Sequence, residues 1–227
     1  MNDRDVDPSP WKTVPATALA SRRLPVLRRK CSESELSQVL LPMLLSHVLE
    51  HERAVVYFEP TTMVFDAMRD LDAQLEEAPI LMVPYAQRPR VAREAVDEIG
   101  LIAEGAYNDG FLGLRRSPAA SAFLEWWGSR VLGAATRLPQ PSPRPIRGRS
   151  WWDLAPCYFE TLRVLRDPRY GATALDGTRG LEMKDGRLYA GKVRSHFFQF
   201  TPNVDAPSAL RSLYRSYRAA LRGRGPE

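Results

Sequence analysis

The chain has 227 residues, a formal net charge of +5 and 44% hydrophobic residues, which suits one domain of ordinary size with a substantial core. No apolar run approaches the roughly 20 residues that cross a bilayer, so the sequence does not predict a transmembrane helix. The two cysteines are too few for a disulfide framework, so a disulfide-rich protein is excluded as well. The polar, acidic start of the chain does not resemble a secretory signal, and we expect a cytoplasmic protein.

The first part of the chain is predicted to be irregular and then helical. Residues 1–31 contain four prolines and no sustained periodicity, so we expect a loosely ordered arm. Ser32 and Glu35 have the spacing of a capping box, and the apolar residues after them recur at helical intervals. We therefore predict a helix from Ser32 with a bend near Pro42, where a backbone donor is lost.

A β-α-β pattern follows this helix. Residues 54–58 form a short apolar run that is typical of a buried parallel strand, and Glu59 would lie at its carboxyl end. Asp66 is a predicted helix cap, and residues 80–83 form a second strand-like run. Ligands gather at the carboxyl ends of strands in open α/β sheets, so Glu59 is a candidate site residue. An ordinary strand-end carboxylate explains it equally well.

The middle of the chain carries a turn signal and a helix start. Asn108, Asp109 and Gly110 all tolerate turn conformations, so they predict a turn that leads into a strand. Ser117 followed by Pro118 is typical of the first residues of a helix. The turn chemistry alone explains the three turn residues without a functional role.

The last part of the chain combines a loop, a hairpin and a helix. Residues 137–149 are rich in proline and arginine, which predicts a loop. Asp185 and Gly186 between short apolar runs predict a β-hairpin. Residues 206–227 predict an amphipathic helix with one apolar face and one arginine face. Such a helix either packs on its own domain or makes peripheral contact with an anionic membrane, and both alternatives stay open here.

Arginine is unevenly distributed along the chain. It is concentrated in residues 22–30, 137–149 and 211–224. Clusters of this kind attract nucleic acid, anionic lipid or phosphorylated ligands through their field. These clusters lack the interleaved aromatic side chains on which single-stranded nucleic acids stack, so we expect no nucleic-acid partner.

Three segments share their order and local pattern with a known family, and they are residues 55–62, 107–114 and 148–154. They resemble bacterial nucleotide-sugar glycosyltransferases of the GT-A fold, in the glycogenin and galactosyltransferase group. The resemblance covers about three quarters of the chain and implies an α/β fold with a mixed, mainly parallel sheet flanked by helices, over residues 32–205. Residues 1–31 show no strand pattern, so we expect this GT-A-like fold to be incomplete at its N-terminal, nucleotide-binding end.

The resemblance also implies a donor site. In the family an Asp-x-Asp motif holds a divalent metal against the donor diphosphate, and here these positions read Glu59-Pro60-Thr61. The family's Tyr-Asn-Ser-Gly-Phe turn, whose asparagine helps to position the donor sugar, is matched by residues 107–111. A basic side chain such as Lys192 would neutralise the diphosphate. The donor-binding candidates are Glu59, Thr61, Asn108, Asp109, Gly110 and Lys192.

The catalytic and metal-binding candidates come from two further matches. Residues 151–154 resemble the family's Trp-Leu-Asp-Leu, which makes Asp153 and the preceding Arg149 catalytic candidates. His196 lies where many relatives have a histidine that completes the metal site, although a satisfied core histidine is the simpler interpretation. Two routes would preserve activity. Glu59 and His196 would hold Mn²⁺ or Mg²⁺, or Arg149 would neutralise the diphosphate without a metal.

Two functions follow from the resemblance. The first is a hexosyltransferase that moves a hexose from a nucleotide-sugar donor to an unknown acceptor. The second is a noncatalytic protein that keeps the scaffold and binds a sugar, a nucleotide or a protein partner. The loss of the second carboxylate at Thr61 favours the noncatalytic alternative, because a carboxylate pair supplies hard oxygen ligands for a divalent ion.

Overall fold

The chain divides into two compact units. One comprises residues 1–51 and 124–148, and the other comprises residues 52–123 and 149–227. The computed structural model describes residues 12–86, 99, 101–102, 105–137, 150–170, 172–173, 181–200 and 211–222. Among these residues, no helix has both the length and the apolar composition that crossing a bilayer requires.

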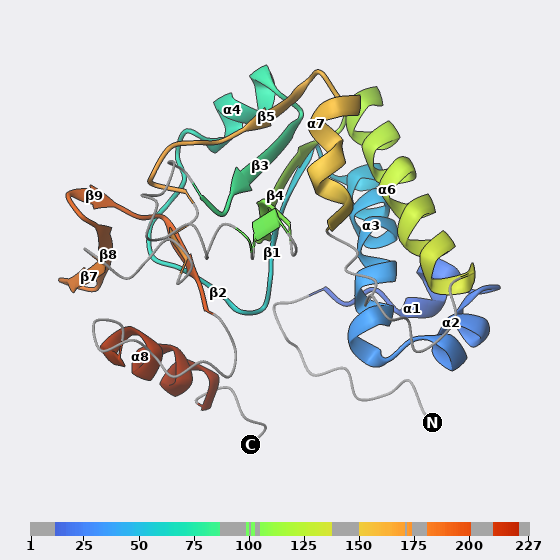
Figure 1. Ribbon diagram of the computed structural model, residues 1–227, viewed down its shortest axis with the longest axis horizontal. Helices are drawn as coiled ribbons and strands as arrows, with labels where there is room; N and C mark the ends of the chain where they lie inside the picture. The colour runs from blue at the N-terminus through green and yellow to red at the C-terminus, as the bar shows by residue number, and fades with distance from the viewer. Residues whose placement is uncertain are drawn as a thin grey trace. The chain divides into compact units, whose positions relative to one another are not determined.

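The first unit is helical in its described part. It contains α1 (Ala16–Ala20), α2 (Leu24–Lys30), α3 (Glu33–His51) and the second half of α6 (Pro118–Arg137) (Figure 1). Its buried residues include Leu27 of α2, Val39 of α3 and Ala135 of α6, which form one apolar cluster.

Two of these helices correct a prediction. The helices α1 and α2 lie within the segment that was expected to be a loosely ordered arm. Each is too short to be stable alone in water, since isolated helices below about 12 residues are marginal. The burial of Leu24 and Leu27 supplies the stabilisation that local periodicity does not. The segment therefore has regular structure over Ala16–Ala20 and Leu24–Lys30.

The start of α3 confirms the predicted capping box. The amide of Glu35 donates to Ser32 Oγ at 3.3 Å, and the amide of Ser32 donates to Glu35 Oε2 at 2.8 Å. Two backbone donors that a helix start leaves unpaired are thereby satisfied. The helix continues through Pro42 to His51.

The second unit is built on a four-stranded mixed sheet. The strands lie in the order β1 (Ala54–Phe58), β4 (Tyr107–Arg115), β3 (Ile80–Pro84) and β5 (Leu162–Val164). The strand β4 is antiparallel to both of its neighbours, whereas β3 and β5 pair in parallel. The α/β class is confirmed. The sheet is only partly parallel, and β1 is half-buried and pairs antiparallel instead of forming a fully buried parallel strand.

Two smaller sheets complete the strands of this unit. One has the order β2 (Thr62–Val64), β10 (Phe197–Gln199) and β6 (Ala172–Thr173). The other has the order β7 (Leu181–Lys184), β8 (Arg187–Ala190) and β9 (Val193–Arg194). The predicted hairpin joins β7 to β8, and its turn residues Asp185 and Gly186 have φ angles of 50° and 71°. Positive φ at both central positions is the reason for the Asp-Gly pair.

The remaining helical segments of the unit are short except for the last. They are α4 (Leu71–Glu77), a 3-10 turn (Ser150–Leu154), α7 (Ala155–Tyr158) and α8 (Arg211–Arg222). The helix α4 begins after Asp70, so the predicted cap at Asp66 is wrong. The carboxylate of Asp66 instead pairs with Arg194 at 2.6 Å. The start of α6 at Pro118 is confirmed.

The helix α8 is amphipathic and uses its apolar side within the unit. Leu213 and Tyr214 are buried in a cluster with Phe198 and Phe200, while Arg215 is exposed. The ring of Tyr217 stacks on Phe200 with a centroid distance of 4.0 Å. The apolar residues of α8 therefore pack within this unit, as the first of the two alternatives predicts.

An aromatic cluster joins the four-stranded sheet to β10. The rings of Phe111 in β4 and Phe197 in β10 stack with a centroid distance of 5.4 Å and an interplanar angle of 7°. Phe58 of β1 meets both rings edge to face, at 5.7 and 5.4 Å. Tyr170 meets Phe111 in the same way. Strands from three distant parts of the sequence are therefore fixed side by side at the end of β1.

Candidate functional site

The carboxyl end of β1 lies beside the start of β4. Their antiparallel register pairs Phe58 with Phe111, and the amide of Glu59 donates to the carbonyl of Gly110 at 3.2 Å. The carbonyl of Thr61 accepts from the amide of Phe200 at 2.9 Å. We call this place the β1-end site. Its residues are Tyr57, Glu59, Thr61, Thr62, Tyr85, Asn108, Asp109, Gly110 and Gln199.

Two carboxylates of the β1-end site accept hydrogen bonds from neutral side chains. Tyr57 donates its hydroxyl proton to Glu59 Oε2 at 2.5 Å. Asp109 Oδ1 accepts from the hydroxyl of Tyr85 at 2.6 Å and from the side-chain amide of Gln199 at 2.8 Å. These hydrogen bonds fix the positions of the two carboxylates. The site therefore presents carboxylate oxygens, which are hydrogen-bond acceptors, in defined positions.

Asn108 and Gly110 form the buried floor of the site. Asn108 Oδ1 accepts from the amide of Gly110 at 2.7 Å, which assigns the oxygen of the side-chain amide to that side. Its Nδ2 is buried and has no hydrogen-bond partner within the described part of the chain. An unpaired buried donor costs about 1–3 kcal/mol, so a group that accepts from it would be stabilising.

The three residues Asn108, Asp109 and Gly110 were expected to form a turn, and this is wrong. They belong to β4, which runs without interruption from Tyr107 to Arg115. On either side of these three residues, Tyr107 pairs with Pro84 of β3 and Phe111 pairs with Phe58 of β1, and the carbonyl of Gly110 accepts from the amide of Glu59. These nonlocal contacts hold the segment in the strand.

His196 lies in a different group of side chains. Its ring packs on Tyr170 with a centroid distance of 4.9 Å, and neither ring nitrogen has a hydrogen-bond partner among the described residues. His196 precedes β10 and Phe200 follows it, and the four residue steps between them correspond to about 13 Å of extended strand. The amide of Phe200 donates to the carbonyl of Thr61, so His196 is at one end of β10 and the segment that follows Glu59 is at the other. The structure does not bring these two proposed metal ligands together.

Charged side chains surround Tyr170 on this side of the unit. Arg169 pairs with Asp167 at 2.6 Å and with Asp70 at 2.7 Å, and the hydroxyl of Tyr170 donates to Asp70 at 2.9 Å. Burial lowers the pKa of His196 below its ordinary value, and the charge of Arg169 lowers it further. The side-chain hydrogen bond from Arg169 holds the pKa of Asp167 low.

The catalytic candidate Asp153 holds the backbone that leads into β4. Its Oδ1 accepts from the amide of Ala106 at 2.9 Å. Burial raises the pKa of the Asp153 carboxyl, although hydrogen bonds from the amides of Ala106 and Tyr107 act in the opposite direction. Asp153 therefore has a positioning role in this structure. Arg149 lies outside the described residues, and Lys192 is exposed in the turn between β8 and β9.

The fit of a Mn²⁺ or Mg²⁺ ion depends on the oxygen ligands present. Within the described ranges, the β1-end site does not bring three His, Cys, Asp or Glu side chains within ligating distance of one another. A hard divalent ion takes about six oxygen ligands. Glu59 would have to share such an ion with water or with phosphate oxygens of a ligand.

Tyr57, Tyr85 and Gln199 are site residues that the sequence analysis missed. Tyr85 directly follows the carboxyl end of β3, the same position relative to its strand as Glu59 after β1. The rule that ligands bind at the carboxyl ends of strands in open α/β sheets would have identified Tyr85 as a candidate. Tyr57 is two residues from Glu59 in a strand and so shares its face. No local signal identifies Gln199.

Comparison of the chain with models of protein families, with curated proteins and with solved structures finds no significant match.

We predict that Gly110→Ala destabilises the second unit. A Cβ at this position would lie 2.7 Å from Gln199 Cδ and 2.9 Å from Asn108 Oδ1. Moving either side chain would break its hydrogen bond to Asp109 or to the amide of residue 110. The free energy of unfolding should fall by about 1–3 kcal/mol in urea denaturation.

Gly133→Ala is the matched control. Gly133 lies in α6, and a Cβ there meets nothing within 4 Å among the described residues. The same substitution should raise stability by about 0.5–1 kcal/mol, because alanine is the better helix former. Equal effects of the two substitutions would contradict the close approach at Gly110.

We predict that His196 makes stability depend on pH. The folded pKa is below the unfolded value of about 6.5, so the unfolded chain binds more protons between these two values. The contribution of His196 to the free energy of unfolding should therefore be constant above about pH 6.5. It should fall as the pH drops below this value. In His196→Gln, the decrease in unfolding free energy between about pH 7 and pH 5 should be smaller than in the wild type. An unchanged slope would mean that His196 is not buried as described.

Proposed function

We propose that the chain is a glycosyltransferase-like protein and that its β1-end site binds the sugar of a nucleotide-sugar donor. The observation that carries this proposal is the meeting of the three resembling segments around the start of β4. The first segment, residues 55–62, contains most of β1, which pairs with β4. In the third segment, residues 148–154, Asp153 accepts a hydrogen bond from the amide of Ala106, which precedes β4. Segments far apart in the sequence thus share one place in the second unit.

The chemistry of the site suits a polyhydroxylated ligand. Sugar hydroxyls both donate and accept hydrogen bonds. Glu59 and Asp109 offer carboxylate acceptors, while Asn108 offers a buried amide donor that has no partner among the described residues. Tyr57 and Tyr85 hold the two carboxylates in place, so a ligand would meet groups that are already ordered.

The mixed sheet supports the GT-A-like part of the proposal. Glu59 leaves β1 at its carboxyl end, and Tyr85 leaves β3 at the carboxyl end of a strand with the same direction. This is where ligands of open α/β sheets bind. We propose the GT-A-like fold for this unit on that basis, together with the resemblance.

Binding without transfer is the form of the proposal that we favour. Thr61 stands where the resembling enzymes have the second carboxylate of the pair that holds a divalent ion. A noncatalytic protein does not need that pair, and the hydrogen bonds that position Glu59 and Asp109 are sufficient for binding. Hexose transfer to an acceptor is the second candidate, and it requires an additional group that stabilises the diphosphate leaving group.

Calorimetric titration tests the binding proposal. UDP, GDP and their hexose conjugates would be titrated into the full chain with and without Mn²⁺. We expect a hexose conjugate to bind more tightly than the free nucleotide, because the site contacts the sugar. Asn108→Ala and Glu59→Gln should each weaken this binding at least about tenfold, since a hydrogen bond to a charged or buried group contributes about 1.5–3 kcal/mol.

Glu182→Gln is the control for these variants, because Glu182 is an exposed carboxylate on β7 of the same unit. It should leave the affinity unchanged. The absence of binding by every conjugate, or equal affinities in all three variants, would refute the proposal. Turnover of the bound conjugate that requires Mn²⁺ and disappears in Glu59→Gln would select the transferase over the noncatalytic alternative.

A further inference from the structure

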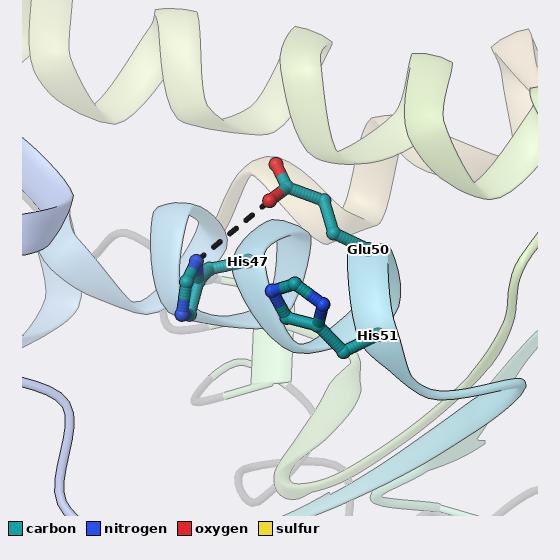
Figure 2. A group of neighbouring side chains, drawn as sticks. All are labelled: His47, Glu50 and His51. Carbon is teal, nitrogen blue, oxygen red and sulfur yellow. Dashed lines mark ion pairs between the residues drawn. The ribbon is translucent and has the colours of Figure 1, made fainter.

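A second group of polar side chains lies in the first unit, at the end of α3. His47, Glu50 and His51 all belong to the last five residues of this helix. Residues that are three or four positions apart on a helix share one face. Figure 2 shows the three side chains on neighbouring turns, with the two imidazole rings next to each other. Two histidines four residues apart on one helix face are a spacing that zinc sites use.

The ligand atoms of the three residues are close together. His47 Nδ1 is 3.8 Å from Glu50 Oε2, and one ligand atom from each of the three residues lies within 4.8 Å of the others. Zinc bonds of about 2.0–2.2 Å in a tetrahedral arrangement put neighbouring ligand atoms about 3.3 Å apart. The side chains must therefore close by about 0.5–1.5 Å to bind one ion.

The three side chains lie at the surface, where rotation about their side-chain bonds can bring the ligand atoms together. The side chains of His47 and Glu50 are 40% and 67% exposed, and His51 is also exposed. The rings of His47 and His51 meet edge to face at a centroid distance of 5.4 Å, so no other side chain separates them. The helix backbone holds the three Cα positions at fixed spacing, which reduces the entropy that ion binding costs.

The position of the group on the helix favours a cation. His51 is the last residue of α3, and the carbonyl ends of a helix carry a partial negative charge. The carboxylate of Glu50 supplies an oxygen ligand within 4.8 Å of a ring nitrogen of each histidine. A divalent ion at this place would gain from the helix end and from this ligand.

Two members of the group, His47 and Glu50, line a cavity of the first unit. The cavity has a volume of about 840 Å³, and its lining includes His47, Glu50, Arg22 and Arg23. All of its lining residues belong to the first unit. An ion held by three protein ligands on the rim of a cavity keeps a fourth position that a water or an anionic ligand can occupy, whereas structural zinc sites use four protein ligands.

We propose that His47, Glu50 and His51 bind a divalent transition-metal ion of the Zn²⁺ type, with one coordination position open toward the cavity. Imidazole ligands select Zn²⁺, Ni²⁺ or Cu²⁺, and they disfavour Mg²⁺, which takes oxygen ligands. The site shares no residue with the β1-end site and does not depend on the function proposed there.

Titration of the full, untagged chain with ZnCl₂ tests the site. We expect one Zn²⁺ per chain and no binding of MgCl₂ at the same residues. His47→Ala and His51→Ala should each reduce the affinity for Zn²⁺ at least about tenfold, because the loss of a ligand costs no less than the loss of an outer-shell partner. The melting temperature of the wild type should rise with added Zn²⁺, and that of the double variant should not.

Two controls keep the result interpretable. His196→Gln removes a buried histidine from the other unit and should leave the Zn²⁺ affinity unchanged. Metal-free His47→Ala and His51→Ala should melt within a few degrees of the wild type, because surface substitutions change stability by about 0.5 kcal/mol. A wild type that binds no Zn²⁺, or binding that survives in both His47→Ala and His51→Ala, would overturn the proposal.

Discussion

The stacking of Phe111 on Phe197, with Phe58 against both rings, is the contact on which the candidate site depends. These rings come from β4, β10 and β1, so their burial fixes three strands of distant origin in one place. Phe111 follows Gly110, Phe58 precedes Glu59, and Phe197 is two residues before Gln199. The aromatic core thereby determines where the polar residues of the β1-end site meet. Offset and edge-to-face ring contacts also restrict the relative rotation of the strands.

The elements with a strong local signal could be predicted from the sequence. The capping residues Ser32 and Glu35, the Asp185-Gly186 turn and the start of α6 at Pro118 each satisfy a short-range geometric requirement. The helices α1 and α2 could not be predicted in this way, because their stability comes from buried leucines such as Leu27, whose neighbours lie far along the chain. The turn expected at Asn108 is wrong for the same reason, because contacts with residues far along the chain, such as Tyr107 with Pro84 and Gly110 with Glu59, outweigh turn propensity.

Some residues of the candidate site could also be predicted from the sequence, whereas others could not. Position after a strand identified Glu59, and the resemblance identified Asn108 and its neighbours. The residues that position them are far away in the sequence. Gln199, for example, donates a hydrogen bond to Asp109, and no local sequence pattern predicts this contact. The interpretation of His196 as a satisfied core histidine is correct for its burial and its packing on Tyr170, but neither ring nitrogen has a hydrogen-bond partner among the described residues. Glu59 and His196 were expected to hold one metal ion, which requires the two side chains to be close together. The strand β10 separates them instead.

The most direct measurement of the central claim is a ¹⁵N-¹H correlation spectrum of the chain during titration with a hexose conjugate of UDP or GDP. The account predicts that the largest shifts occur at the side-chain amide of Asn108 and at the backbone amides of Gly110 and Glu59. The backbone amides of the last turn of α3 should not move. Shifts confined to that turn, or shifts spread evenly over the surface, would contradict the claim that the segments around β4 form one ligand site.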